Sequence, residues 1–263
     1  MTDKTAPLSR ELMASRILLR AVLPVARVVV EDDPKMNAAF KGVTAGFQIR
    51  ARNGSGMLGA GLRVNDGRME WTDGIMADPD ICFTFKTPAA MNAFLTGGIA
   101  LPRIKGLTRP ALLSKFIRLL LSLKLLMPDN RPSRPDRVRL KIKLVMYMIT
   151  TALSQYNKAG DPDMAKWTGM QPDRIYQMSC EPEGIAAYLR VKAGKSKAGR
   201  GYYKRKLPFV HMKFNGAENA LPVFLNEVEF VEAISKGYVA VEGSPEYAAK
   251  LNDFMQRIQA LIT

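Results

Sequence analysis

Side chains that carry most enzyme chemistry are scarce in this chain of 263 residues. It has one histidine, His211, and two cysteines, Cys82 and Cys180. A Ser–His–Asp or Cys–His arrangement would have to use His211, and no Cys/His spacing resembles a metal site. His211 lies in the alternating run FVHMKF, which places it on the strand face opposite Val210 and Met212. We therefore expect a protein that is not an enzyme and that uses no cofactor and no metal.

Long uncharged apolar runs are also missing. The richest run, residues 111–127, is interrupted by Lys115, Arg118 and Lys124, so it does not predict a transmembrane helix. Arginines interrupt the apolar segment near the N-terminus, which argues against a signal peptide. Two cysteines in predicted strands indicate reduced core residues. These absences predict a cytoplasmic protein, one that reaches the membrane only as a peripheral protein.

The sequence contains the glycine spacing of a nucleotide-binding motif without the structural context that the motif needs. Gly54, Gly56 and Gly59 spell G-x-G-x-x-G, but that fingerprint needs a helix to begin there. The segment that follows, residues 61–71, predicts two strands joined by an Asn-Asp-Gly turn. We interpret these glycines as part of a hairpin with a bulge.

The sequence contains an internal repeat. Six stretches match in order, at spacings of 127 to 130 residues that rise to 137 at the last match. The matched pairs are 33–42 with 161–169, 47–49 with 176–178, 62–68 with 189–195, 81–85 with 210–214, 94–95 with 224–225, and 104–106 with 241–243. An insertion near residues 226–235 explains the last spacing. The order predicts an internal duplication of a unit of roughly 130 residues, an ordinary domain size.

Each copy predicts the same series of elements. A helix opens it, at residues 8–30 or 137–156, and Pro24 is expected to kink or split the first of these. Three strands follow, near residues 44–53, 56–65 and 67–73 in the first copy and near 173–181, 184–193 and 199–206 in the second. After them come an alternating fourth strand, a short helix and a strand–glycine–helix unit with Gly106 or Gly243 at the corner. Strands followed by helices indicate an α+β fold. We expect a first unit at residues 1–130, a second at 131–263, and a linker at 127–136.

The net charge of +15 is concentrated in two stretches. Residues 101–150 contain twelve Lys or Arg and two acidic residues, and residues 190–206 contain eight cations and no acid. Such a localised basic face predicts an anionic partner. The candidate contacts for an anionic membrane are Arg131, Arg134, Arg137, Arg139, Lys141, Lys143, Lys192, Lys195, Lys197, Arg200, Lys204, Arg205 and Lys206.

Nucleic acid is the less favoured anionic partner. Tyr202 and Tyr203 lie inside the second basic stretch and could stack on bases. Adjacent residues of a strand face opposite sides, however, so at most one of the two could stack on that surface.

Aromatic and methionine side chains fall on the predicted inward faces of both copies. The simplest interpretation is two hydrophobic cores. The 15 methionines are many for this length, and methionine is common where a surface must fit varied apolar shapes. This composition is compatible with a cavity for a lipid.

The order of these elements resembles the sterol carrier protein type two domain. The stretches that carry the resemblance are Phe47–Ile49, Asp80–Lys86, Phe94–Gly98, Ile104–Gly106, Pro208–Phe214 and Gly237–Leu261. The resemblance implies an α+β domain with a five-stranded, mainly antiparallel sheet covered by helices, here in two tandem copies. It also implies an apolar tunnel for sterols, fatty acyl groups or other lipids, and no catalysis by the domain itself. The chain ends in Leu-Ile-Thr and lacks the peroxisomal tripeptide of the family.

The leading hypothesis is therefore a protein that binds and transfers a lipid such as a sterol, a fatty acid or an acyl-CoA-like molecule. The expected lipid-binding residues are Phe83, Phe85 and Phe94 in the first copy and Met212, Phe214, Phe224, Phe230, Tyr247, Leu251, Phe254 and Met255 in the second. The second copy is favoured, because residues 111–127 predict a helix that is apolar almost all round and buried on several sides or in a membrane interface. The alternatives are a non-catalytic partner or scaffold for a lipid-metabolising enzyme, and nucleic-acid binding.

Overall fold

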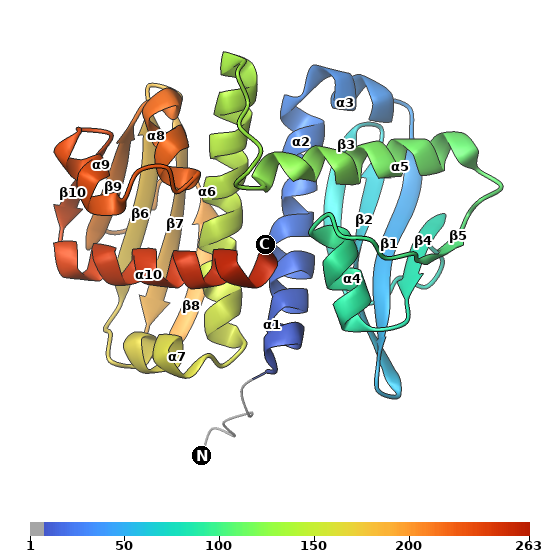
Figure 1. Cartoon of the computed structure of the whole chain (residues 1–263), viewed down its shortest axis with the longest axis horizontal. Helices are drawn as coiled ribbons and strands as arrows, with labels where there is room; N and C mark the ends of the chain where they lie inside the picture. Colours follow the sequence, from blue (N-terminus) through green and yellow to red (C-terminus); the bar gives the residue numbers. More distant parts are fainter. Residues whose placement is uncertain (1–7) are drawn as a thin grey trace. The chain divides into compact units, whose positions relative to one another are not determined.

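Residues 8–263, which the computed structural model describes, fold into two compact α+β units (Figure 1). One unit is built from residues 10–124 and the other mainly from residues 125–261. The division between Lys124 and Leu125 lies a few residues before the linker expected at 127–136.

Each unit contains one five-stranded sheet, and the two sheets have the same strand order. The first sheet runs β3-β2-β1-β4-β5 and the second β8-β7-β6-β9-β10. In each, one central pair is parallel, β1 with β4 and β6 with β9, and the other three pairs are antiparallel. The strands are β1 (Thr44–Asn53), β2 (Gly56–Asn65), β3 (Arg68–Asp73), β4 (Ile81–Phe85), β5 (Arg103–Lys105), β6 (Arg174–Glu181), β7 (Ile185–Lys192), β8 (Lys195–Arg200), β9 (Val210–Asn215) and β10 (Val239–Gly243). The expected α+β fold with two five-stranded, mainly antiparallel sheets is confirmed.

The register of the parallel pairs is also the same in both units. Phe47 aligns with Ile81 in the first sheet, and Tyr176 aligns with Val210 in the second. These four residues are matched positions of the repeat. A one-residue slip would move every inward side chain to the other face, so the shared register keeps the same positions in the core of each unit.

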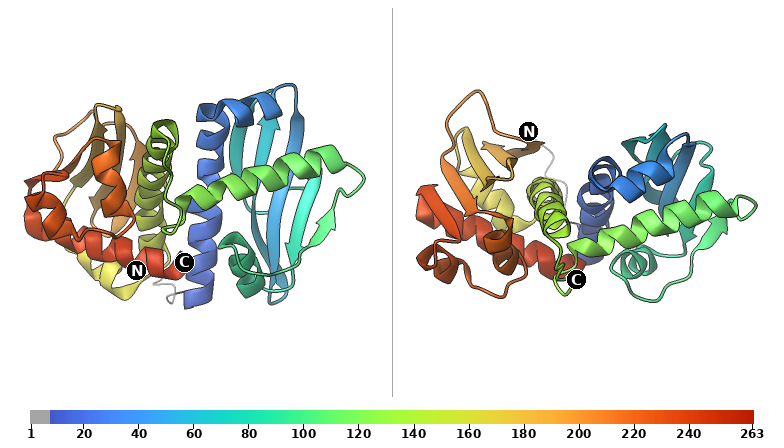
Figure 2. Two further views of the ribbon diagram at one scale, coloured as in Figure 1. Left: turned by 45° about the horizontal axis from the view of Figure 1, so that its top comes forward. Right: turned by 90° about the horizontal axis from the view of Figure 1, so that it is seen from above.

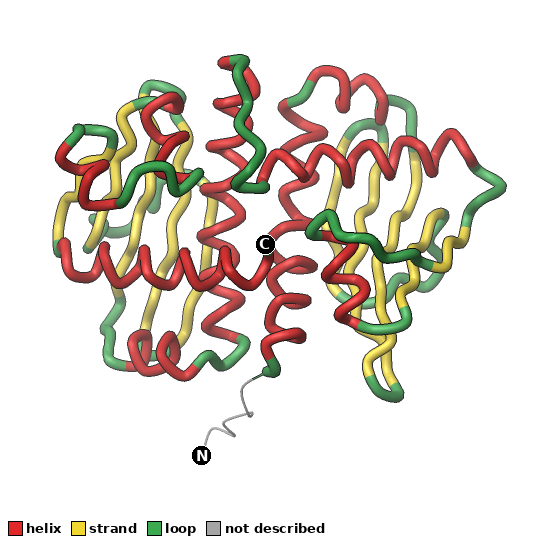
Figure 3. The backbone as a smooth tube through the Cα atoms, viewed as in Figure 1, coloured by secondary structure: helices red, strands yellow, loops and turns green. Residues whose placement is uncertain are grey.

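Helices cover one face of each sheet. The last long helix of each unit, α5 (Pro110–Ser122) or α10 (Pro245–Ile262), crosses its own sheet (Figure 2). Figure 3 distinguishes the helical segments from the strands and the loops. The remaining helical segments are α1 (Arg10–Ile17), η1 (Leu18–Val22), η2 (Leu23–Val25), α2 (Ala26–Asp32), α3 (Pro34–Phe40), α4 (Pro88–Leu95), η3 (Leu123–Leu126), α6 (Pro135–Lys158), α7 (Pro162–Gly169), α8 (Ala217–Phe224) and α9 (Phe230–Ser235).

The opening helix differs between the units. In the second unit, α6 continues without a break for 24 residues and packs against β7 and β8. In the first, Pro24 has no N–H to donate and would clash with the carbonyl four residues earlier. The chain there passes from α1 through one wide π turn, η1, and one tight 3-10 turn, η2, into α2. The sequence predicted this split.

The connector after each opening helix is capped in the same way. The Asp33 carboxylate accepts hydrogen bonds from the N–H groups of Lys35 and Met36, and the Asp161 carboxylate accepts one from Met164. A proline occupies the first turn of both α3 and α7. The paired Asp-Pro in the sequence is therefore a helix start in both copies.

One strand of the second unit differs from expectation. The third strand was predicted at 199–206 but begins at Lys195, because Ala193 and Gly194, with φ of 44° and 81°, form a tight turn directly after β7. The insertion near residues 226–235 folds into the short helix α9.

The corner glycines lie at equivalent places. Gly106 has a φ of 97° and Gly243 a φ of 95°. A Cβ atom at Gly106 would lie 2.3 Å from the Asp80 carbonyl oxygen, and one at Gly243 would lie 2.0 Å from that of Phe209. Only glycine combines this backbone conformation with so close an approach.

A buried glutamine at the centre of each sheet shows the closest agreement between the units. The two N–H bonds of Gln48 Nε2 are shared among the carbonyl oxygens of Ile49, Ala60 and Gly74 at 2.9 to 3.2 Å, and its Oε1 accepts the N–H of Met76 at 2.7 Å. Gln177 repeats every one of these contacts. Its Nε2 donates to Met178, Ala187 and Gly201, and its Oε1 accepts from Tyr203 at 3.0 Å. Both side chains are 0% exposed.

We predict that Gln48→Leu and Gln177→Leu each destabilise the protein by about 2–4 kcal/mol. Leucine is similar in size but leaves several buried backbone groups without partners, at about 1–3 kcal/mol for each group that water cannot reach. Chemical denaturation followed by circular dichroism measures the change. Gln256→Leu, on the exposed side of α10, is the control and should stay close to wild type. Equal stability of all three variants would contradict the structural role of the amide.

Candidate functional site

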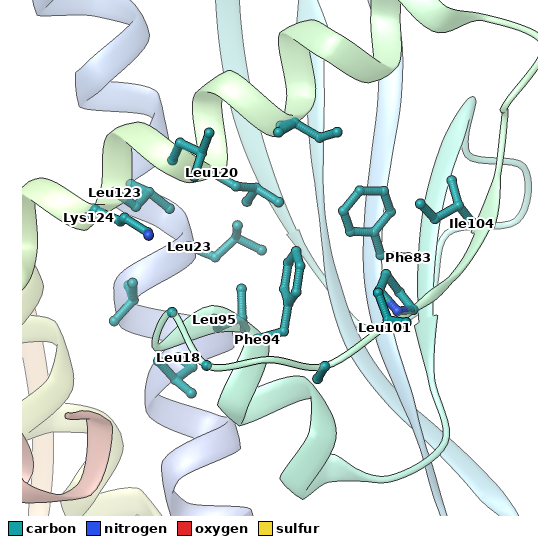
Figure 4. Close-up of a pocket in the computed structure, with 17 residues that line it drawn as sticks. Leu18, Leu23, Phe83, Phe94, Leu95, Leu101, Ile104, Leu120, Leu123 and Lys124 are labelled. Atoms are coloured by element: carbon teal, nitrogen blue, oxygen red, sulfur yellow. The ribbon is translucent and has the colours of Figure 1, made fainter.

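The first unit contains an apolar pocket of about 350 Å³ (Figure 4). This volume lies within the range of about 300–1,000 Å³ that is usual for small-molecule sites. Its walls come from the broken opening helix, β4, α4, the loop before β5, β5 itself and the end of α5. The lining residues are Leu18, Val22, Leu23, Phe83, Phe94, Leu95, Gly97, Gly98, Ala100, Leu101, Pro102, Ile104, Ile117, Leu120, Leu121, Leu123 and Lys124.

The break at Pro24 shapes one wall of this pocket. Leu18 and Val22 lie in the π turn and Leu23 in the 3-10 turn that follows it. A π turn changes the helical phase, so side chains after it point in directions that a regular helix would not give them. Pro24 thus changes the local helix geometry, and this geometry shapes the pocket wall.

The opposite wall is aromatic. Phe83 meets Phe94 edge to face with ring centroids 5.7 Å apart, and Phe116 of α5 meets Phe83 at 5.2 Å. Phe116 also stacks on Phe47 of β1 at 4.7 Å. Figure 4 shows Phe83 and Phe94 pointing into the same space as Leu23 and Leu120. These contacts fix α4 and α5 to the sheet and hold the pocket between them.

Lys124 is the one charged side chain among the 17 residues that line the pocket. It follows Leu120 and Leu121 by one helical turn, and its side chain is exposed. Within the described part of the chain, no acidic residue forms an ion pair with it. The site therefore offers a large apolar wall and one available ammonium group at its edge, a combination suited to an amphiphile with an anionic or polar head.

The predicted lipid-binding residues of the first unit gather at this site. Phe83 and Phe94 line the pocket, and Phe85 lies behind Phe94, with ring centroids 5.2 Å apart. The sequence did not single out the leucines of the broken helix or Lys124. The signal that could have found them is Pro24, because a proline inside an apolar helix displaces the side chains around it.

The predicted lipid-binding residues of the second unit pack mainly against other side chains. Leu251 and Phe254 of α10 are both 0% exposed. Phe254 contacts Trp167 with ring centroids 5.4 Å apart, and Tyr247 contacts Phe209 at 5.2 Å. Phe214 stacks on Phe224 with ring centroids 4.8 Å apart. Met212 is buried on β9 and Met255 is half-buried on α10. Phe230 is the first residue of α9. The sequence favoured this unit as the lipid site, whereas the pocket described above lies in the other.

The reason lies in the helix that the sequence expected to be buried on several sides. Instead, α5 buries Phe116 and Leu119 on one side only. Ile117 and Leu121 are 39% and 53% exposed on the next side, where they border the pocket. One apolar stripe of α5 is thus exposed to solvent beside the pocket.

The predicted anion contacts fall into two groups. Around the start of α6, Arg131 pairs with Glu227, Arg134 pairs with Asp136, and Arg139 donates to the Glu183 carbonyl oxygen. Arg137 and Lys143 are half-buried in the same helix. In the second group all seven predicted residues are exposed: Lys192, Lys195, Lys197, Arg200, Lys204, Arg205 and Lys206. The second stretch is therefore the more accessible basic surface.

Lys141 was predicted to contact an anion, and this prediction is wrong. It is 1% exposed, and its Nζ donates to the carbonyl oxygens of Leu125, Met127 and Asn130 at 2.9, 2.7 and 2.7 Å. Burial lowers the pKa of this ammonium group to about 8. Lys141 ties the chain before α6 to the helix and does not reach a surface.

The two tyrosines of the second basic stretch are engaged differently. Tyr203 packs on Tyr188 with ring centroids 5.0 Å apart. Tyr202 is 46% exposed and donates its hydroxyl to Glu181 at 2.5 Å. As expected, at most one of these rings is open enough to stack on a base.

Close to these tyrosines lies a polar cluster on the second sheet that the sequence did not predict. Ser179 Oγ and His211 Nε2 lie 2.8 Å apart, and Glu242 Oε2 lies 4.0 Å from His211 Nδ1. The order Ser–His–Glu resembles a hydrolytic triad. Ser179 is only 2% exposed, however, and the Glu242 carboxylate is held by Lys213 Nζ at 2.5 Å. The serine is thus poorly accessible and the imidazole has no close carboxylate to orient it.

The described residues offer neither a metal site nor a reactive thiol at Cys180. No group of His, Cys, Asp and Glu side chains within residues 8–263 could hold a metal ion. Burial, with Glu183 nearby, raises the pKa of the Cys180 thiol to about 12, so the thiolate is not formed at neutral pH. No helix in the same part of the chain is long and apolar enough to cross a bilayer.

Comparisons with known proteins give weak structural likeness alone. No protein-family model matches the chain, and no curated protein matches it. The solved structures that match include two of a sec-alkylsulfatase. They are a double mutant of PisA1, at 14% identity and a TM-score of 0.27, and the stereoselective inverting enzyme Pisa1 from Pseudomonas sp., at 15% and 0.26. The matches cover 62% and 60% of this chain but 31% and 30% of those chains, so this chain spans about a third of their length.

We predict that Ser179 does not react with a fluorophosphonate probe, because its hydroxyl is buried and its histidine is not activated. Labelling is measured by intact mass spectrometry, with a serine hydrolase as the positive control. An adduct that disappears in Ser179→Ala would show that the cluster is a functional nucleophile site.

His211 should also make stability depend on pH. Burial and the nearby Lys213 lower its pKa in the folded state below the usual 6.5. The unfolded chain then binds a proton before the folded one does, so stability falls as the pH drops through 6.5. We expect the loss of stability between pH 7 and 5 to be smaller in His211→Asn than in wild type, measured by thermal unfolding. Identical pH profiles would contradict the lowered pKa.

Proposed function

We propose that this protein binds a lipid in the pocket of its first unit and carries it without catalysing a reaction. The observation that carries the proposal is the pocket itself, a space of about 350 Å³ with aliphatic and aromatic walls and one ammonium group at its edge. Apolar walls favour binding by about 25 cal/mol for each Å² of lipid surface removed from water. The resemblance to sterol carrier protein type two domains supports the same function.

The head of the ligand would lie near Lys124. That side chain is exposed at the edge of the lining, whereas Leu18, Leu23 and Phe83 are each 1% exposed. An acyl chain would therefore lie against these buried apolar side chains and leave its polar end beside the ammonium group. A fatty acid or an acyl-CoA-like molecule fits this polarity better than an uncharged sterol.

The exposed basic stretch at residues 192–206 would attract the protein to anionic membranes. Each cation close to such a surface contributes roughly 1 kcal/mol. In this proposal the protein is cytoplasmic, works at the membrane periphery, and has no reaction of its own. The buried Ser179 supports the absence of catalysis.

A matched pair of substitutions tests the pocket. Leu120 lines the space, so Leu120→Trp should fill it and lower affinity for a fluorescent fatty acid such as cis-parinaric acid at least tenfold, with little loss of stability. Leu251 is 0% exposed in the packed second unit. Leu251→Trp should instead cost about 1–3 kcal/mol through overpacking, and the protein that remains folded should bind the probe as wild type does.

Native mass spectrometry of the purified protein, followed by solvent extraction, identifies what the pocket carries. We expect an acyl lipid that is lost in Leu120→Trp and kept in Leu251→Trp. No extractable lipid, together with equal probe binding by wild type and Leu120→Trp, would overturn the proposal. The protein would then be better explained as a non-catalytic partner of a lipid-metabolising enzyme.

A further inference from the structure

The loop that closes one side of the pocket presents its largest side chains to solvent. Ile99 is 101% exposed and Leu101 is 94% exposed. Single exposed aliphatic residues are ordinary on a protein surface. Here, however, Leu101 lines the pocket together with Ile117 and Leu121 of α5, which are themselves exposed. The exposed aliphatic side chains therefore gather around one opening.

The backbone fixes this exposure. The N–H of Gly97 donates to Phe94 at 3.2 Å, and the N–H of Gly98 donates to Ala93 at 2.7 Å. Gly97 has a φ of 93°, which turns the chain sharply away from the end of α4. Ile99 follows directly after this turn. Its side chain is thus directed outward by hydrogen bonds within the loop.

The same region carries charge of one sign only. Residues 97–126 contain six Lys or Arg and no acidic residue. Lys105 of β5 and Arg109, directly before α5, pair with Asp78 and Asp80. Arg118 and Lys124 remain beside the apolar stripe, because positions 117, 121 and 124 share one helix face and position 118 lies next to it.

We propose that the pocket mouth, defined as Ile99, Leu101, Ile117, Leu121, Arg118 and Lys124, docks onto an anionic lipid bilayer. The aliphatic side chains would enter the boundary between head groups and acyl chains, and the two cations would lie at the level of the phosphates. A nucleic acid gives no apolar environment for Ile99 and Leu101. A bilayer matches both features, and a lipid could then pass between membrane and pocket without crossing water.

This inference concerns how the proposed lipid site reaches its ligand, so the experiment separates docking from lipid binding. Docking is measured by sedimentation with vesicles of phosphatidylcholine and phosphatidylserine, and with vesicles of phosphatidylcholine alone. Lipid binding is measured in solution with cis-parinaric acid. Ile99 and Arg118 do not line the pocket, so Ile99→Asp and Arg118→Glu should leave probe binding unchanged.

Matched controls come from the second unit. Leu207 is 86% exposed and follows the basic stretch that contains Lys204. We expect Ile99→Asp to lower partitioning onto the mixed vesicles at least tenfold, about 1.4 kcal/mol. Arg118→Glu should also lower partitioning, and the binding that remains should depend less on salt. Leu207→Asp should bind as wild type does. Lys204→Glu should reduce binding only through long-range attraction, which disappears at high salt.

A tryptophan in place of Ile99 gives a direct optical test. The emission of Ile99→Trp should shift to the blue when mixed vesicles are added, and that of Leu207→Trp should not. The inference is overturned if wild type does not bind the mixed vesicles, or if Ile99→Asp binds them as wild type does. It is also overturned if Leu207→Asp is the variant that loses binding, because docking would then run through the second unit. Lost vesicle binding with intact probe binding would leave the proposed lipid site standing.

Discussion

The hydrogen bonds of one buried amide hold each sheet together at its centre. Gln48 and Gln177 each join their own strand to the neighbouring strand and to the chain that leaves the third strand. Their Oε1 atoms accept the N–H of Met76 or Tyr203, which would otherwise be left without a strand partner. A glutamine fits because its amide offers two donors and one acceptor oxygen together. The chain after the third strand can therefore turn back under the sheet and pair in parallel with the first strand.

The same sheet then supports two different interiors. In the second unit, α6 is continuous, and Trp167, Phe209, Tyr247 and Phe254 fill the space under α10 with aromatic contacts. In the first, Pro24 breaks the opening helix, and the matching space is bordered by leucines and by two phenylalanines of β4 and α4. Planar rings of this size fill a volume that branched aliphatic side chains leave partly open. The difference between a packed core and a pocket thus arises from a few side chains and one proline.

The elements that repeat were predictable from the sequence because each depends on local chemistry. Asp33 and Asp161 cap helices, Gly106 and Gly243 turn corners, and the paired spacing indicates that both units share one arrangement of strands. The location of the pocket was not predictable in this way. It depends on which side chains fill a shared space, and on a change of helical phase after Pro24 that periodicity does not show. Lys141 was misjudged for a similar reason, because three carbonyl oxygens distant in sequence surround it.

The helix α5 explains why a pocket and an exposed apolar surface occur together. Its composition is apolar on more sides than the sheet can cover, so burying Phe116 and Leu119 leaves Ile117 and Leu121 at the surface. In an ordinary soluble domain such positions would be polar, because exposed aliphatic area favours association. Here the adjacent stripe also forms the pocket wall through Leu120. Polar residues at the two exposed positions would make the mouth of the site hydrophilic, and an apolar chain entering from a bilayer would then have to cross polar surface. If the protein takes up a lipid as proposed, the exposed apolar stripe of α5 avoids that barrier, at the cost of a surface that is unfavourable in water.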